Sequence, residues 1–442
     1  MAAKTKKALM IVFGFPPRAG SGIQRIVKFV EFLPQNGWEP IILTIPRWGN
    51  DISDTTWEEK IPPGTRIYRI MSLDPMRILL ALRFLRKAKT SINTTVNAAV
   101  SSESGIFEKL KKFYDRVSIP DSAIWWVPSA FIGGICLLIR FNPELIFTTS
   151  GPYGTSLAGL ILKKISGKPW IAEFRDPWIN NPQRISEQRG GKVEESMQNS
   201  CLRNVDGVIA TTEPTTKEFV GLSRTKNPPI SAVITNGYSE EHFPDTQTIP
   251  DAERFRIVFT GMFYGDRSPE YFFQALKECC ESSEEFFRKT KVTIAGTIPK
   301  NHRQELTESP LKEIVEVLGY VSHERSIESI KHADLLYLFL SKGEADIYPA
   351  KVFEYLAVRK YILAAIPPKG ITKTMIERFK AGTIIEPDDI EGHTKALLNC
   401  FDKFKNGELR VQHSLKDVEE FEWKNIVKKV AAFFETVRQT IK

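Results

Sequence analysis

The residues with the clearest chemical potential lie in one stretch, DIYPAKVFE, at residues 346–354. It places a lysine, Lys351, between two acids, Asp346 and Glu354, behind a proline. Pro349 suits the first turn of a helix because its φ is fixed near the helical value. A helix start offers backbone N–H groups and a positive dipole end, which favour phosphates and sugar hydroxyls. Ordinary surface helices carry the same residue types, so both a binding and a structural interpretation stay open.

Three further polar loops follow apolar, strand-like runs in the first half of the chain, at residues 14–22, 150–154 and 175–178. Loops at the carboxyl ends of parallel strands converge on one edge of a sheet. Arg175 and Asp176, which lie beside aromatic residues, are therefore candidates for ligand contact. The alternative is an ion pair between them that only holds the loop.

The first of these loops contains Ser21 and Gly22 but is neither a P-loop nor a GxGxxG motif. It fits a phosphate site and a structural turn about equally well.

Composition indicates a soluble globular chain of two or three domains, with 442 residues, 42% hydrophobic and 26% charged. Five cysteines without a CxxC pair and six histidines without ligand spacing argue against disulfides and structural zinc. They favour a reducing compartment. The first apolar run is a strand and no signal peptide, and we expect no apolar stretch of about 18 residues and so no membrane-spanning helix.

Most of the net charge of +8 lies between Met76 and Arg116. Two basic amphipathic helices are predicted there, at residues 76–89 and 104–117. Such helices either lie on an anionic membrane surface or pack on the domain with a solvated basic face. No nucleic-acid-binding motif accompanies the charge, so we expect no nucleic-acid partner.

Apolar strands alternate with helices along the whole chain, which predicts two successive doubly wound α/β domains. The expected boundaries are residues 1–245 for the first domain, 246–405 for the second and 406–442 for a helical tail. The stretch at 346–354 follows a strand of the second domain. The predicted strands are 8–14, 39–45, 67–70, 145–149, 169–173, 207–211 and 232–235, then 255–260, 292–295, 315–318, 335–340, 361–366 and 383–386.

Six segments together resemble the GT-B glycosyltransferases, specifically bacterial enzymes of glycosyltransferase family 4. They are FPPRAGSGIQRIVKFVEFLPQNGWEPIILT, KPWIAEFRDPW, ITNGY, FTGMFYGDRSPEYFFQAL, GYVSHERSIESIKHADLLYLFL and PAKVFEYLAVRKYIL. The resemblance implies two Rossmann-like domains facing a central cleft, with a C-terminal helix that returns to the first domain. It implies transfer of a sugar from a nucleotide-sugar donor to an acceptor, usually with retention of the anomeric configuration.

The resemblance also implies donor-binding residues. Ser21 and Gly22 match the family's Gly-Gly turn at the donor diphosphate, where glycine lets backbone approach the ligand. Gly261 and Arg267 lie in the loop after the first strand of the second domain, from which the family contacts the diphosphate. A guanidinium suits that contact because it bonds phosphate in a bidentate way. The downstream lysine usual in the family is absent from this loop.

The family's pair of acids, separated by seven residues, matches Asp346 and Glu354. The second acid usually binds the ribose hydroxyls and the first the donor sugar, although Asp346 is one methylene shorter than the usual glutamate. Lys351 stands where it could approach phosphate. Arg175 and Asp176 stand where the family often has a histidine, and are implied to contact the acceptor or the donor sugar.

No Asp-x-Asp motif is present, so we expect no essential metal and no cofactor besides the nucleotide-sugar substrate. Helix dipoles with Arg267 and Lys351 would stabilise the leaving diphosphate. The expected acceptor is a glycan or a lipid-linked glycan in polysaccharide or lipopolysaccharide assembly. The expected location is the cytoplasm, with the inner face of the membrane as the open alternative. Two other functions remain: a nucleotide-sugar epimerase of the same fold, and a non-catalytic partner of a glycan-assembly complex.

Overall fold

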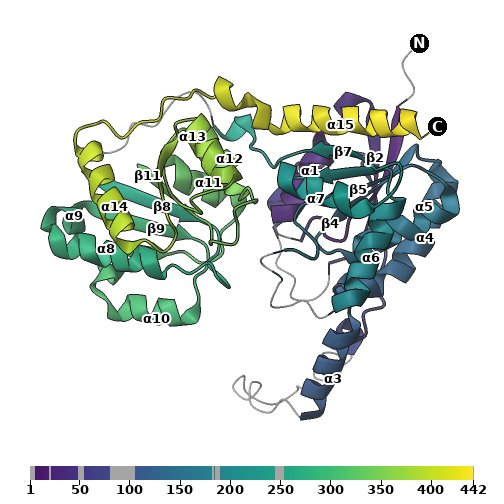
Figure 1. Ribbon diagram of the computed structural model, residues 1–442, viewed down its shortest axis with the longest axis horizontal. Coiled ribbons are helices and arrows are strands. Elements are labelled where there is room, and N and C mark those ends of the chain that lie inside the picture. Colours follow the sequence, from purple (N-terminus) through teal and green to yellow (C-terminus); the bar gives the residue numbers. More distant parts are fainter. Residues whose placement is uncertain are drawn as a thin grey trace. The chain divides into compact units, whose positions relative to one another are not determined.

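A computed structural model describes residues 5–18, 21–47, 54–79, 105–181, 184, 190–243 and 253–441 (Figure 1). The chain forms two compact units. The first domain comprises Met1–Ile234 and Val427–Lys442, and the second comprises Thr235–Ile426. The sequence had placed the corresponding boundaries at 245/246 and 405/406.

The first domain is built on a seven-stranded sheet whose paired strands are all parallel. Its central strands are continuous apolar runs because helices cover both faces of the sheet. The strand order is β3-β2-β1-β4-β5-β6-β7, so the winding reverses between β1 and β4. The strands are β1 (Lys6–Ile11), β2 (Trp38–Thr44), β3 (Arg66–Arg69), β4 (Leu145–Ser150), β5 (Trp170–Phe174), β6 (Gly207–Ala210) and β7 (Ile230–Val233).

Helices of the first domain pack on both faces of this sheet. On one face, Trp126, just before α4, packs its ring edge to face on Phe13 at 5.6 Å. On the other face, the ring centre of Phe434 in the last helix lies 5.4 Å from that of Trp38 and 5.5 Å from that of Phe147. The C-terminal helix therefore returns to the first domain, as expected. The helices are α1 (Ser21–Phe32), α3 (Gly105–Val117), α4 (Val127–Phe141), α5 (Gly154–Ser166), α6 (Gly191–Asn204), α7 (Glu213–Ser223) and α15 (Trp423–Thr440).

The two predicted basic helices have different outcomes. The helix expected at 104–117 is confirmed as α3, which extends away from the sheet of the first domain (Figure 1). On its predicted apolar face, Phe113 is 65% and Val117 40% exposed, so these side chains do not pack on the domain. Most of the helix expected at 76–89 lies outside the described residues.

One described stretch is long and apolar enough to cross a membrane, contrary to the expectation that none exists. It is Ser122–Phe141, a short 3₁₀ turn followed by α4, with mean hydropathy 1.8 and 44% of its most apolar window buried. Trp126, Ala130 and Leu137 on its inner side belong to the core of the first domain. Length and composition alone are therefore weak grounds for a membrane span.

The second domain is built on a six-stranded parallel sheet in the order β10-β9-β8-β11-β12-β13, so its winding reverses between β8 and β11. Two apolar layers cover it, one containing Phe272 of α8 stacked on Tyr337, the other containing Val352 and Leu356 of α12. The strands are β8 (Phe255–Thr260), β9 (Thr290–Ala295), β10 (Val315–Val317), β11 (Leu335–Phe339), β12 (Tyr361–Ala365) and β13 (Gly382–Ile385). The helices are α8 (Glu270–Ser282), α9 (Glu284–Lys289), α10 (Lys300–Glu308), α11 (His323–Lys331), α12 (Lys351–Val358), α13 (Ile371–Arg378) and α14 (Ile390–Lys405).

Helix α12 begins at Lys351, two residues after the proline expected to start it. Pro349 instead offers its carbonyl oxygen to the amide of Val352 at 2.9 Å, inside the turn that leads into the helix. Lys351 is therefore the first helical residue, directly behind the loop that follows β11.

Candidate functional site

The predicted donor site lies where the winding of the second sheet reverses. Ligands of open α/β sheets bind outside the carboxyl ends of the strands at such a point. The loops that follow β8 and β11 meet there. The first loop carries Gly261 and Arg267, and the second leads through Glu344 to Lys351.

Arg267 is held by a buried carboxylate that the sequence reasoning missed. Its Nε lies 2.9 Å from Oε2 of Glu344 and its Nη2 2.6 Å from Oε1. Oε2 of the same carboxylate also accepts hydrogen bonds from the backbone amide of Ser341, at 2.9 Å, and from its hydroxyl, at 3.0 Å. This bidentate pair fixes the plane of the guanidinium. An acid in a polar loop gave no signal in the sequence that it would be buried.

Lys351 is partly buried and lies beside Arg267. Its Nζ donates to the carbonyl oxygen of Thr260 at 2.9 Å and lies 3.6 Å from the ring centre of Phe259. Burial, and then the charge of Arg267, hold the pKa of Lys351 well below its usual range, against the opposing effect of Glu344. An incoming anion would offset both effects, so this lysine is suited to meet a diphosphate.

The backbone that follows β8 and β9 also lies close to Lys351. Gly261 has φ +116°, and a Cβ on it would lie 3.6 Å from Nζ of Lys351. A Cβ on Gly296, which follows β9, would lie 1.5 Å from the carbonyl oxygen of Gly261. Both positions therefore require glycine, and the ends of β8 and β9 come together without side chains between them.

Glu354 lies one turn further along α12. Its Oε1 lies 2.7 Å from Nε2 of His323, the first residue of α11, and its side chain is 12% exposed. The ring of His242 lies 5.3 Å from that of His323. Sequence reasoning missed His323, although it lies at a helix start after a strand, as does Lys351. The other predicted acid, Asp346, is exposed.

The structure brings the three predicted loops of the first domain together around Arg175. Its Nε donates to the carbonyl oxygen of Ser150 at 3.1 Å, and its Nη2 to that of Gly151 at 2.7 Å. A Cβ on Gly22 would lie 1.5 Å from Nη1 of Arg175. These contacts place the guanidinium against the start of α1, while Asp176 beside it is half-buried. Ser21 begins α1, and its side chain is not among those described.

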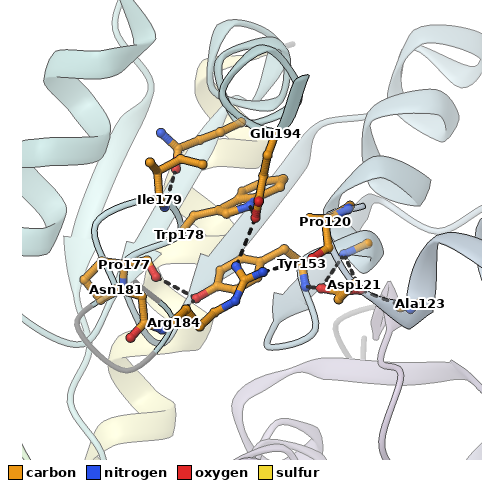
Figure 2. Close-up of polar contacts among 12 residues, drawn as sticks. Pro120, Asp121, Ala123, Tyr153, Pro177, Trp178, Ile179, Asn181, Arg184 and Glu194 are labelled. Carbon is orange, nitrogen blue, oxygen red and sulfur yellow. Dashed lines mark hydrogen bonds and ion pairs between the residues drawn. The ribbon is translucent and has the colours of Figure 1, made fainter. Parts of the chain in front are cut away.

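A buried polar network lies behind this loop (Figure 2). The hydroxyl of Tyr153 donates to the carbonyl oxygen of Pro177 at 2.6 Å, and its ring stacks on Trp178 at 5.0 Å. The indole of Trp178 donates to Glu194 at 2.9 Å. Asp121 accepts the amide of Tyr153 at 2.5 Å, and burial raises the pKa of this carboxyl. The network fixes the loop that carries Arg175.

A second buried pair, also missed, ties α1 to β5. Nε of Arg25 lies 2.9 Å from Oε1 of Glu173, and the hydroxyl of Thr149 donates to Oε2 at 2.7 Å. Both charged side chains are almost completely buried. Burial lowers the pKa of Arg25, and the carboxylate of Glu173 opposes that effect. A glutamate inside the otherwise apolar strand WIAEF was the available signal for such a partner.

The described part of the chain contains no group of three or more histidine, cysteine, aspartate or glutamate side chains placed to hold a metal ion. The two domains instead offer cationic side chains at their strand ends. The second domain presents an arginine and a partly buried lysine, and the first presents Arg175.

No protein-family model and no curated protein sequence matches the chain. Solved structures do. Sucrose-phosphate synthase from Thermosynechococcus elongatus superimposes with a TM-score of 0.66 at 14% identity, covering 98% of this chain and 100% of that one. HepE from Anabaena, in complex with UDP and glucose, gives 0.62 at 13% identity, covering 98% and 100%. A putative UDP-N-acetylglucosamine 2-epimerase from Listeria monocytogenes gives 0.57 at 12% identity, covering 98% and 96%.

These similarities extend over nearly the whole chain at low identity, and they establish the fold. The chain has the two-domain α/β fold of the GT-B proteins, with parallel sheets of seven and six strands. The expectation from the sequence is confirmed at this level. Membership of glycosyltransferase family 4 is a finer statement that these similarities do not reach.

Proposed function

We propose that the protein is a glycosyltransferase that moves a sugar from a nucleotide-sugar donor to an acceptor. The observation that carries this proposal is the cluster of Arg267, Lys351 and Glu354 at the winding reversal of the second sheet. Two cations there suit a diphosphate, and a carboxylate one helical turn away suits ribose hydroxyls. Two of the solved structures similar to the chain support it by name: HepE in complex with UDP and glucose, and the putative UDP-N-acetylglucosamine 2-epimerase.

In the proposed reaction the sugar–phosphate bond breaks as the acceptor oxygen attacks. Negative charge develops on the leaving diphosphate, where Arg267, Lys351 and the start of α12 would stabilise it. The leaving phosphate accepts the acceptor's proton, so no strong protein base is required. The acceptor oxygen attacks from the same face of the sugar that the diphosphate leaves, so the anomeric configuration is retained, and no step uses a metal. Asp346 is proposed to contact the donor sugar, and Gly261 the diphosphate.

The first domain is proposed to bind the acceptor, with Arg175 and Asp176 at the sugar and Ser21 and Gly22 facing the diphosphate. The acceptor class we propose is a glycan or a lipid-linked glycan in cell-surface polysaccharide or lipopolysaccharide assembly. The proposed location is the cytoplasm, at the inner face of the membrane. Exposed Phe113 and Val117 on the basic helix α3 support the membrane part.

A panel of nucleotide-sugars tests the proposal through thermal stabilisation, since a ligand that binds the folded chain raises its melting temperature. UDP-sugars come first. We expect one donor to stabilise the protein and to release its nucleoside diphosphate only when an acceptor is supplied. Absence of stabilisation by every donor would contradict the proposal.

A nucleotide-sugar epimerase is the second candidate, favoured by the structural similarity to the Listeria protein. Analysis of the products separates the two functions. An epimerase converts the donor into an isomer without consuming any acceptor. A glycosyltransferase produces one extended acceptor for each nucleoside diphosphate released. Donor binding with neither product would indicate the third interpretation, a non-catalytic partner of a glycan-assembly complex.

A further inference from the structure

The first domain has a pocket between its edge strand β3 and helix α4. The pocket has a volume of about 420 Å³, within the range of roughly 300–1,000 Å³ that is usual for ligand sites. Its walls include Tyr68, Arg69 and Ile70 at the end of β3, and Ile132, Cys136 and Arg140 on α4. Among the residues that the structure describes, no aspartate or glutamate lines it. Apolar walls with two arginines would suit a ligand that is part hydrocarbon and part anion.

The outer side of α4 is apolar where a surface helix usually carries polar residues. Ile132 is 64% exposed and Ile139 80% exposed, on successive turns with the exposed Cys136 between them. The inner side has Gly133, on which a Cβ would lie 2.1 Å from Ile70. Glycine thus lets α4 approach the end of β3, and an apolar ridge borders the pocket.

The residues that follow β3 continue this apolar surface. Met71, Leu73 and Ile78 are 47%, 56% and 44% exposed. The amide of Leu73 donates to the carbonyl oxygen of Trp125 at 3.1 Å, which attaches the segment to the turn before α4. Contiguous exposed apolar residues on a folded domain mark an interaction surface.

Arg140 supplies positive charge at the pocket. Its guanidinium group and that of Arg66 lie 5.2 and 5.0 Å from the ring centre of Phe141, near the end of α4, and Arg66 also forms an ion pair with Glu39. Elsewhere on the same domain, helix α3 carries exposed Lys109, Lys111 and Arg116. Apolar residues with a basic border are the combination that binds anionic membrane surfaces. A sugar would instead require a denser set of polar side chains.

We propose that the β3–α4 pocket binds a hydrocarbon chain of an anionic phospholipid, with Arg140 at the phosphate of its headgroup. The exposed apolar side chains of Ile132, Ile139, Met71, Leu73 and Ile78 then lie in the surface layer of the bilayer. The inference names the site for the proposed membrane association and rests on that part of the proposed function. The donor cluster is built from residues of the second domain, so the two can be tested separately.

Cys136 gives a direct test because it lines the pocket and is exposed. Cys201, Cys279 and Cys400 are buried, and burial raises the pKa of Cys280 to about 11, so a small thiol-reactive fluorophore should prefer Cys136. A C280S background makes the labelling specific. Vesicles of phosphatidylglycerol should shift the emission of the fluorophore on Cys136 to the blue. Lipids with a nitroxide on their hydrocarbon chains should quench that emission. Vesicles of phosphatidylcholine should do so far less. Absence of quenching by the chain nitroxide would overturn the proposal.

Variants complete the test with vesicle co-sedimentation. The double variant I132Q/I139Q should bind phosphatidylglycerol vesicles at least about tenfold more weakly, because two apolar side chains no longer enter the bilayer. R140Q should lose about fivefold, the effect of one basic residue at an anionic surface. V193Q is the control, since Val193 on α6 is also more than half exposed (55%). Thermal melts confirm that each variant folds.

Two further outcomes would contradict the proposal. Vesicle binding that is unchanged in I132Q/I139Q excludes the pocket and its ridge. A wild-type dimer that becomes monomeric in I132Q/I139Q, with no vesicle binding, shows that a second copy covers this face. Stabilisation by nucleoside diphosphate should be equal in wild type and variants. Its absence from all of them would refute the proposed transferase while the vesicle result still decides the lipid site.

Discussion

Two cations with unequal surroundings distinguish the second-domain site at the residue scale. Arg267 is oriented by a bidentate ion pair with buried Glu344. Lys351 is partly buried, and its ammonium group donates to a backbone carbonyl. A diphosphate placed beside both side chains would receive a directional contact from Arg267. Its negative charge would raise the pKa of Lys351 and favour the protonated amine.

The protonation of Lys351 gives the first prediction. Its pKa is lowered by burial and by Arg267, so the folded chain binds fewer protons than the unfolded chain between that lowered pKa and the usual value near 10.5. The unfolding free energy should therefore rise with pH across this window. K351M should remove this component and leave stability at neutral pH equal or higher. Denaturant unfolding at a series of pH values measures it.

The same lysine links ligand binding to protons. A bound diphosphate should raise the pKa of Lys351, so wild type should take up a proton on binding at pH values above the lowered pKa. Calorimetry in buffers of different ionisation enthalpy detects this uptake, and K351M should lose it. Equal proton exchange in both proteins would contradict the assignment of this lysine to phosphate.

A second prediction concerns Arg267. R267K should weaken nucleoside diphosphate binding roughly tenfold to a hundredfold, because a lysine cannot reproduce a planar, bidentate contact with phosphate. R303K is the matched control, since Arg303 is exposed on α10. Titration calorimetry compares the three proteins. Unchanged affinity in R267K would remove Arg267 from the proposed site.

Loop convergence is the main feature at the scale of elements. The start of α1 and the loops after β4 and β5 meet at one guanidinium, that of Arg175, and Gly22 makes room for it. Behind them, a buried ion pair between α1 and β5 and the aromatic network of Figure 2 leave these loops little freedom. The rim of the first domain is thus assembled from three separate segments of the chain.

Gly22 supplies the third prediction. In G22A the new Cβ would occupy the position of Nη1 of Arg175, so the guanidinium must move. We expect kcat/KM for sugar transfer to fall at least about tenfold, because both the guanidinium and the backbone proposed to face the diphosphate are displaced. G14A is the control in the same loop, because its Cβ would meet Ile23 at an ordinary 3.5 Å. Equal losses in G22A and G14A would contradict a specific role for Gly22.

The fourth prediction concerns Glu173. E173Q leaves the guanidinium of Arg25 buried without its countercharge, which typically costs about 3–5 kcal/mol of stability. E213Q, at an exposed pair with Lys217, should change stability by less than about 1 kcal/mol. Urea unfolding followed by circular dichroism measures both. A loss in E173Q no larger than that in E213Q would show that the buried pair is dispensable.

Sequence patterns predicted much of this arrangement, and the omissions have physical causes. The apolar runs gave the strands of both sheets, and the rule that loops follow carboxyl ends brought residues 14–22, 150–154 and 175–178 together correctly. The pairs Arg25–Glu173 and Arg267–Glu344 join residues far apart in the sequence, so periodicity does not reveal them. Helix α7 was missed because its Thr- and Glu-rich sequence has a weak apolar face.

At the scale of the whole molecule, the chain forms two Rossmann-like domains. The last helix belongs mainly to the first domain, through Phe434 against Trp38 and Phe147. The expected boundary at 245/246 followed the polar composition of residues 239–253, whereas the compact unit ends at Ile234. Composition marks polar segments, while compactness depends on which residues pack together. That difference explains why the domains were predicted and their borders were displaced.

The central claim is that the cluster at the winding reversal of the second sheet binds the nucleotide of a sugar donor. Titration calorimetry with the nucleoside diphosphate that stabilises the protein most, and with its 2′-deoxy analogue, tests it most directly. Wild type should prefer the ribose form. E354Q should bind both forms with equal, lower affinity, because it lacks the carboxylate that we propose to hold the ribose hydroxyls. E328Q, at an exposed glutamate of α11, should behave as wild type. Absence of binding by every nucleoside diphosphate, or an undiminished ribose preference in E354Q, would contradict the account.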